Sequence, residues 1–132
     1  MPFINIKVAG PALSSDQVAR LQKRSTELIA GLLRKNAEVT NVLVEERPLR
    51  DWAIAGQPAK VAAHLSAEVT TGTNTPEEKA SFIAEANQLL REVLGSDLSI
   101  ATYVVVDEIN ADAWGYDGLT AESRRKAAAR AA

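Results

Sequence analysis

The chain of 132 residues contains no cysteine and a single histidine, His64. Without cysteine there are no disulfides, thiolate nucleophiles, iron–sulfur clusters or cysteine-based zinc sites. One histidine cannot supply a multi-histidine site, so we expect no bound metal. No stretch reaches the roughly 20 apolar residues of a membrane span. The first residues also lack the charged and apolar regions of a secretory signal. We therefore expect no membrane association and a cytoplasmic protein.

Charges of the two signs are nearly balanced, and aromatic residues are few. Lys and Arg number 15 against 17 Asp and Glu, for a net charge of −2. Binding to phosphate backbones needs a concentrated positive field, so the composition predicts no nucleic-acid partner. Hydrophobic residues make up 46% of the chain and charged residues 24%. This composition is typical of a soluble globular protein, and the length fits a single domain over residues 1–132.

An internal repeat organises most of this domain. Compared with itself at a shift of 62 residues, without a gap, the chain pairs its only two tryptophans and a cluster of neighbouring positions. Chance is a poor explanation for that clustering. The sequence therefore predicts two fused copies of one small unit, over about residues 2–58 and 59–118. The matched pairs are Gly10/Gly72, Leu28/Leu90, Leu32/Leu94, Thr40/Thr102, Val42/Val104, Val44/Val106, Glu46/Glu108, Trp52/Trp114 and Gly56/Gly118.

Each copy has the pattern of a strand, a helix and a second strand. Apolar and polar residues alternate in the first strand, and both helices begin with capping sequences at Ser14 and Thr75. A helix between two strands predicts that they run parallel through a right-handed crossover. The expected strands are 3–8, 39–46, 61–70 and 100–107, and the expected helices are 14–35 and 75–95.

Together the two units predict an α+β fold of order β-α-β-β-α-β, a four-stranded sheet with two helices on one face. The residues expected on the apolar helix faces are Val18, Leu21, Ser25, Leu28, Ile29 and Leu32, and Phe82, Ile83, Ala86, Leu89, Leu90 and Val93. The other sheet face stays bare. Its apolar residues are Phe3, Leu43 and Val105 in one strand parity, or Ile4, Val42 and Val104 in the other. A bare apolar face predicts self-association.

The residue with the most distinctive chemistry is Pro2. Removal of Met1, expected before a small residue, would leave a free secondary amine. A neutral amine in a partly apolar pocket can take a proton from carbon and return it. The other reading is that Pro2 only starts an edge strand, where proline is tolerated.

The start Met-Pro-Phe-Ile-Asn-Ile-Lys-Val, the Gly10 loop, the β-α-β unit of about sixty residues and the aromatic after the second strand resemble the tautomerase superfamily typified by 4-oxalocrotonate tautomerase. The longer members, with two fused units, are the most similar subgroup. The resemblance covers residues 2–118. It implies a homotrimer, no cofactor, and an amino-terminal proline as acid–base catalyst for a small-molecule substrate that carries a carboxylate.

The resemblance assigns roles to individual residues. Pro2 matches the catalytic proline, and Trp52 matches the aromatic that lines the pocket, with Trp114 as its counterpart in the second copy. The gapless repeat pairs Pro2 with His64, which has no free amine. We expect His64 to be a strand histidine, and a degenerate pseudo-site around it is the alternative.

The substrate-binding arginines of the family are not matched. Pro11 follows Gly10 where the family has one arginine, and the second aligns with Asn41 and Tyr103. Asn41 and Tyr103 could instead bind an enolate oxygen. Lys7 and Arg50 are candidates to bind a substrate carboxylate, although surface positions would explain both.

Two functions therefore remain open. The first is a tautomerase that interconverts keto and enol forms of a small 2-oxo acid. The second is a non-catalytic trimeric scaffold or small-ligand-binding protein with the same fold, which the missing arginines favour. The tail over 119–132 has no partner in the first copy and the composition of a helix with a basic face. It is either solvated or a strap across a neighbouring subunit.

Overall fold

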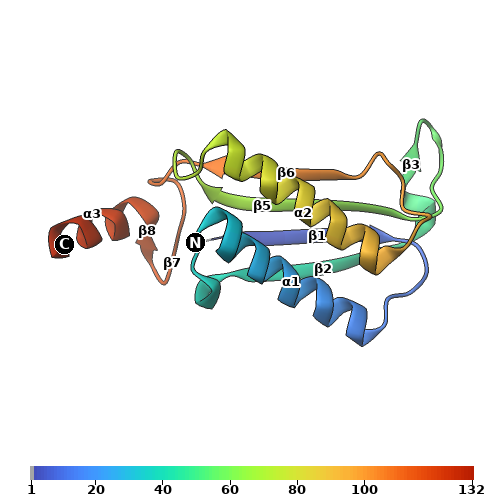
Figure 1. Cartoon of the computed structure of the whole chain (residues 1–132), viewed down its shortest axis with the longest axis horizontal. Helices are drawn as coiled ribbons and strands as arrows, with labels where there is room; N and C mark the ends of the chain where they lie inside the picture. The colour runs from blue at the N-terminus through green and yellow to red at the C-terminus, as the bar shows by residue number, and fades with distance from the viewer. Residues whose placement is uncertain (1) are drawn as a thin grey trace.

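The computed structural model describes residues 2–132, so the fate of Met1 lies outside the described residues. The chain forms two β-α-β units, each followed by a small hairpin, and then a terminal helix (Figure 1). The first unit consists of β1 (Phe3–Ala9), α1 (Ser15–Leu33), η1 (Ala37–Val39), β2 (Asn41–Arg47), η2 (Leu49–Asp51), β3 (Ala53–Ile54) and β4 (Gln57–Pro58). The second consists of β5 (Ala62–Thr70), α2 (Pro76–Leu94), β6 (Tyr103–Ile109), β7 (Gly115–Tyr116), β8 (Leu119–Thr120) and α3 (Ala121–Ala131).

The four long strands form one sheet in the order β2-β1-β5-β6. The pairs β1/β2 and β5/β6 are parallel, and the central pair β1/β5 is antiparallel. Both long helices lie on the same face of the sheet (Figure 1). The α+β fold and the parallel pairing within each unit are therefore confirmed.

Both helices begin where the capping sequences predict. The side chains of Ser14 and Thr75 accept hydrogen bonds from the backbone N–H groups of Gln17 and Glu78, whose side chains bind back to the caps. Each capping box pairs backbone donors that the first turn of a helix leaves free. Both helices end a little earlier than expected, at Leu33 and Leu94.

The core lies between the helices and the inner face of the sheet. Ile4, Ile6 and Val8 are buried on β1, and they alternate with Asn5 and Lys7 on the opposite face. On the helices, the buried residues are Leu21, Ser25, Leu28, Ile29 and Leu33, and Phe82, Ala86, Leu89, Leu90 and Val93. Most of the expected core face is thus present. Ile83 is an exception, with 39% of its surface exposed.

Strand pairing shows that the gapless repeat is wrong by one residue. Phe3 lies opposite Asn41 in the first unit, and His64 lies opposite Tyr103 in the second. The first partners are separated by 38 positions along the chain and the second by 39, because the second unit has one more residue between its helix and its final strand. The first strands and the helices therefore correspond at a shift of 61 residues. The final strands and the hairpins correspond at a shift of 62.

The extra residue changes which positions are equivalent. Leu21 corresponds to Phe82, and both are fully buried. The gapless comparison instead pairs Leu21 with the exposed Ile83. His64 corresponds to Phe3, so the counterpart of Pro2 is Ala63. The predicted pairing of Pro2 with His64 is wrong for this reason.

The residues on the bare face of the sheet are those of the first of the two predicted sets, the one with Phe3, Leu43 and Val105. Phe3, Leu43 and Val105 are exposed on it, whereas Ile4 is fully buried under the helices. Polar residues share this face, among them Asn5, whose amide donates to the Glu45 carboxylate at 3.1 Å. The face opposite the helices is therefore open in one chain, with apolar side chains among polar ones.

The last helix, α3, lies beyond the end of the sheet where β1 begins, away from α1 and α2 (Figure 1). None of its residues is buried in the single chain. Its first turn is held by Thr120, whose hydroxyl accepts from the N–H of Ser123 at 3.0 Å. None of the helices in residues 2–132 is both long and apolar enough to cross a membrane.

Candidate active site

A small cavity of about 210 Å³ lies at the end of the sheet where the chain begins. Pro2, itself buried, forms part of its wall. Among the described residues, its lining is Pro2, Phe3, Val39, Asn41, Glu68, Trp114, Gly115 and Tyr116. The cavity therefore joins the start of the first unit to the end of the second.

The antiparallel pairing of β1 and β5 explains this convergence. Because β6 runs parallel to β5, its last residues lie at the end of the sheet where β1 starts. The segment after β6 then carries Trp114 and Tyr116 toward Pro2. Asn41, the first residue of β2, donates its backbone N–H to the Pro2 carbonyl oxygen at 3.3 Å. Residues far apart in sequence thus meet around Pro2.

Two contacts fix the Trp114 side of the cavity. The indole Nε1 of Trp114 donates to the hydroxyl of Thr70 at 3.2 Å, which ties the ring to the end of β5. The hairpin β7–β8 folds back at Asp117 and Gly118, both with positive φ, the conformation of a tight two-residue turn. A Cβ at Gly115 would lie 2.0 Å from the carbonyl oxygen of Leu119, so only glycine fits there.

Glu68 is a lining residue that sequence reasoning missed. It lies on the bare face of β5, opposite Phe3, and contributes a carboxylate to a cavity lined by no lysine or arginine. The alternation of polar residues His64, Ser66, Glu68 and Thr70 along the strand indicates that these side chains share a face. That Glu68 lies at the same end of the sheet as Pro2 follows from the strand order, which the sequence pattern does not show. Tyr116 was missed for the same reason.

Four of the predicted site residues lie elsewhere in the single chain. Trp52 and Lys7 line a separate hollow of about 650 Å³ at the opposite end of the sheet, with Glu45, Arg47 and Asp51. Tyr103, 68% exposed, starts β6 opposite His64, at that same opposite end. The side chain of Arg50 is 87% exposed. The structure thus brings Pro2, Asn41 and Trp114 together, and it separates them from Trp52, Lys7, Tyr103 and Arg50.

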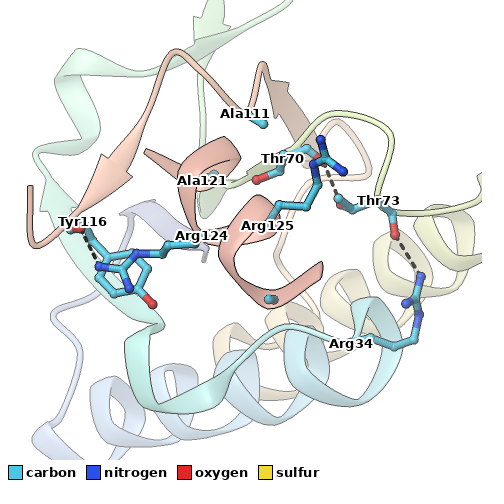
Figure 2. Close-up of a pocket in the computed structure, with 9 residues that line it drawn as sticks. Arg34, Thr70, Thr73, Ala111, Tyr116, Ala121, Arg124 and Arg125 are labelled. Carbon is cyan, nitrogen blue, oxygen red and sulfur yellow. Dashed lines mark hydrogen bonds between the residues drawn. The ribbon is translucent and has the colours of Figure 1, made fainter. Parts of the chain in front are cut away.

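A larger hollow of about 560 Å³ lies beside the Pro2 cavity, between α3 and the loop before α2 (Figure 2). Arg34, Arg124 and Arg125 line it together with Thr70, Thr73 and Tyr116. Arg34 donates to the Thr73 carbonyl oxygen at 2.8 Å and to Glu78 at 2.7 Å. Its guanidinium lowers the pKa of Glu78 to about 2. Tyr116 lines both cavities, so they share a wall.

Among residues 2–132 there is no group of three or more histidine, aspartate or glutamate side chains placed to hold a metal ion. The chemical groups at the Pro2 cavity are organic: one carboxylate, one amide, a phenol and an indole. With a free amine on Pro2, this set can exchange protons with a small ligand and bind its oxygen atoms. The fold and this cavity together define a candidate proton-transfer site at Pro2.

Comparison with known proteins agrees with this class. The family model described as tautomerase enzyme matches residues 2–62 and again 64–124, which is most of the chain. The chain therefore belongs to the tautomerase family and contains two fused tautomerase units. A curated relative, the probable tautomerase K2 of Dickeya dadantii (strain 3937), is 34% identical over 57 residues, which covers 43% of this chain and 85% of that protein.

Solved structures share the fold over almost the whole chain. A fused 4-OT described as a wild-type symmetric trimer is 21% identical, covers 92% of this chain and 98% of its own, and has a TM-score of 0.83. Pt0534, solved after inactivation by 2-oxo-3-pentynoate, is 19% identical with the same coverage and TM-score. The macrophage migration inhibitory factor-like protein of Entamoeba histolytica is more distant, at 14% identity and a TM-score of 0.74. At these identities the similarity establishes the fold.

Proposed function

We propose that this protein is a cofactor-independent tautomerase in which Pro2, after removal of Met1, is the general acid and base. The observation that carries the proposal is the position of Pro2 in the wall of a small cavity lined by three aromatic residues and by polar groups. Membership of the tautomerase family supports the same activity. The substrate class is a small 2-oxo acid or its enol.

The reaction moves one proton between an oxygen atom and a carbon atom of the substrate. In the enol-to-keto direction, Pro2 takes the enol hydroxyl proton and becomes a secondary ammonium, and the substrate becomes an enolate. The same proton then passes from the ammonium nitrogen to the carbon atom next to the carbonyl group, which restores the neutral amine. Burial disfavours a charged amine, so the buried position of Pro2 supports a base that is neutral for part of the time.

The developing enolate needs hydrogen-bond donors. Asn41 lines the cavity, and within residues 2–132 its side-chain Nδ2 has only one long contact, 3.5 Å to the carbonyl oxygen of Val39, so this amide is available to a ligand. The indole N–H of Trp114 is already used by Thr70. In the proposal Asn41 binds the enolate oxygen, while Trp114 supplies an apolar wall that excludes water. Oxyanion donors of this kind contribute about 10²–10³ in rate.

We also propose that the protein is a homotrimer. The bare sheet face exposes Phe3, Leu43 and Val105, and an exposed apolar face is stabilised by association. Several fused 4-OT structures with the same fold are described as trimers. In such an assembly a neighbouring copy could add residues to the Pro2 cavity by bringing its opposite end there. That end carries Trp52, Lys7, Tyr103 and Arg50.

A second candidate function is a non-catalytic ligand-binding protein of the same fold. It is favoured by the absence of lysine and arginine from the cavity lining, since a carboxylate substrate needs a positive charge nearby. This candidate predicts that small neutral ligands, neutral enols among them, bind the cavity without conversion.

The first experiment is the intact mass of protein made without an amino-terminal tag. Loss of one methionine residue is expected, and retention of Met1 would leave no amine on Pro2 and favour the binding function. The second is the tautomerisation rate with phenylenolpyruvate for wild type and Pro2→Ala. We expect Pro2→Ala to lose at least about 100-fold in kcat/KM. Full activity in this variant would end the proposal.

A matched pair of variants tests which tryptophan serves the site. Trp114→Phe removes the indole at the Pro2 cavity, and Trp52→Phe makes the same change at the opposite end of the sheet. We expect the first to lower kcat/KM by about tenfold and the second to leave it near wild type. The reverse order would mean that a neighbouring copy supplies Trp52 to the site.

A further inference from the structure

The Pro2 cavity lacks a group that its proposed substrate requires. Its only ionisable carboxylate is Glu68, and none of its lining residues is a lysine or arginine. A 2-oxo acid carries a negative charge, which Glu68 repels. If the cavity takes such a substrate, a positive charge must act on it either from just outside the lining in the same chain or from a neighbouring copy.

Arg124 of α3 is the cation placed to do so. Its guanidinium carbon lies 3.8 Å from the centre of the Tyr116 ring, and Tyr116 lines the Pro2 cavity. Its Nη2 donates to the Tyr116 carbonyl oxygen at 3.0 Å, so both the ring and the backbone of Tyr116 hold it. Figure 2 shows Arg124 turned toward Tyr116, whereas Arg125 points away from this ring, toward Thr70 and Thr73.

The charge of Arg124 is not used elsewhere in residues 2–132. Arg125 is paired with Glu122, and Arg34 with Glu78, whereas Arg124 has no carboxylate within salt-bridge distance. Its Nε is buried and has no hydrogen-bond partner in the described part of the chain. Buried polar groups are nearly always paired, so this guanidinium N–H is hydrogen-bonding capacity that the described residues leave unused.

The charge of Arg124 can favour an anionic ligand in the Pro2 cavity without touching that ligand. Arg124 is half-buried and held against an aromatic ring, so its charge is screened less than that of a freely moving surface arginine. This charge is stacked on Tyr116, and Tyr116 in turn lines the cavity. The field of Arg124 therefore opposes that of Glu68 and favours an anionic ligand on the Tyr116 side.

We propose that Arg124 is a specificity-determining residue that draws the carboxylate of the substrate to the Tyr116 side of the Pro2 cavity. It takes the role that the missing arginines of the two β-α-β units leave open. This inference rests on the proposed function for its kinetic test, and its binding test does not depend on catalysis. It places the substrate carboxylate near α3 and the reacting carbon near Pro2.

The kinetic test compares Arg124→Gln with Arg125→Gln, which removes the same charge from the next residue of the same helix. The substrates are the enol of phenylpyruvate and the enol of its methyl ester, which lacks the negative charge. We expect Arg124→Gln to lower kcat/KM for the acid by about 10- to 100-fold, mostly through KM. The ester should change less than twofold. Arg125→Gln should leave both substrates near wild type, and Arg124→Lys should recover part of the loss.

The binding test uses phenylacetate and the neutral phenylacetamide as non-reacting probes, with affinity measured by calorimetry on the full-length protein. We expect Arg124→Gln to weaken phenylacetate at least tenfold and phenylacetamide little. Equal weakening of both probes, or equal loss on acid and ester, would show a merely structural role and overturn the inference. An unchanged preference for the anion would also overturn it. Selective loss of phenylacetate binding in a protein without tautomerase activity would end the proposed function and leave the inference standing.

Discussion

Substitution of Phe82 tests both the packing of the core and the register of the internal repeat. It is fully buried, and the structure makes it the counterpart of Leu21, whereas its neighbour Ile83 is 39% exposed. Removal of a buried phenylalanine side chain costs about 3–5 kcal/mol, which combines lost apolar burial with the cavity left behind. Ile83→Ala should cost about 1 kcal/mol, because much of its side chain is already in water.

The expected losses are large enough to measure and small enough to leave a folded protein. A domain of this size has a free energy of unfolding of about 7–20 kcal/mol. At a typical unfolding entropy per residue, Phe82→Ala should lower Tm by about 10–18 °C and Ile83→Ala by about 4 °C. Phe82→Leu, which leaves a smaller cavity, should lie between wild type and Phe82→Ala.

The assay is thermal and urea unfolding followed by circular dichroism, at one protomer concentration because association raises apparent stability. The gapless comparison makes Ile83 the counterpart of Leu21 and so predicts the opposite order of the two variants. If Ile83→Ala is the more destabilising change, both the register and the packing of α2 described above are wrong.

Three further predictions concern stability and the hairpin of the Pro2 cavity. Ser25 is buried and its hydroxyl has no partner among residues 2–132, so Ser25→Ala should raise the free energy of unfolding by about 1 kcal/mol in urea titrations; a destabilised variant would show that the hydroxyl is paired. The Arg34 guanidinium and the α2 cap lower the pKa of Glu78 to about 2 from 4.5. The unfolded chain therefore binds this proton first, and the stability that Glu78 contributes is present above about pH 4.5 and lost as the pH falls toward 2. In Glu78→Gln, which can still form the capping box, the urea midpoint should fall less between pH 5 and pH 2 than in wild type. An identical pH dependence in the two proteins would contradict the assignment. Gly115→Ala places a Cβ against the Leu119 carbonyl oxygen. It should disturb the near-ultraviolet signal of Trp114 and lower activity, whereas Gly118→Ala, in open space but at positive φ, should act mainly on stability.

Local signals in the sequence predicted the elements of this fold well. The capping sequences at Ser14 and Thr75 fix where both helices start, because a cap acts within four residues of chain. Alternation along the first strand predicted its buried residues. Helical spacing predicted most of the core but included Ile83, because Phe82 and Ile83 are adjacent apolar residues and only packing decides which one faces inward.

The repeat was visible in the sequence, but its register was not. Most of the matching pairs lie in the final strands and hairpins, where the shift is 62 residues. They set the alignment for the whole chain, although one additional residue before β6 shifts the first strands and helices to 61. Matches such as Leu28/Leu90 within the helices are therefore not structural counterparts. The hydrogen-bonded strand pairs reveal the inserted residue. An alignment without gaps, scored by identical residues, cannot reveal it.

What the sequence determined by itself was the family, the two β-α-β units and the candidate role of Pro2, because these depend on short-range patterns and one terminal residue. What the tertiary structure decided was which side chains meet Pro2. The antiparallel pairing of β1 with β5 places Trp114, Tyr116 and Glu68 at the start of β1, and the parallel pairing of β1 with β2 places Trp52 at the far end. Strand order and direction join residues more than 60 positions apart, and those long-range pairings leave no periodic trace in the chain.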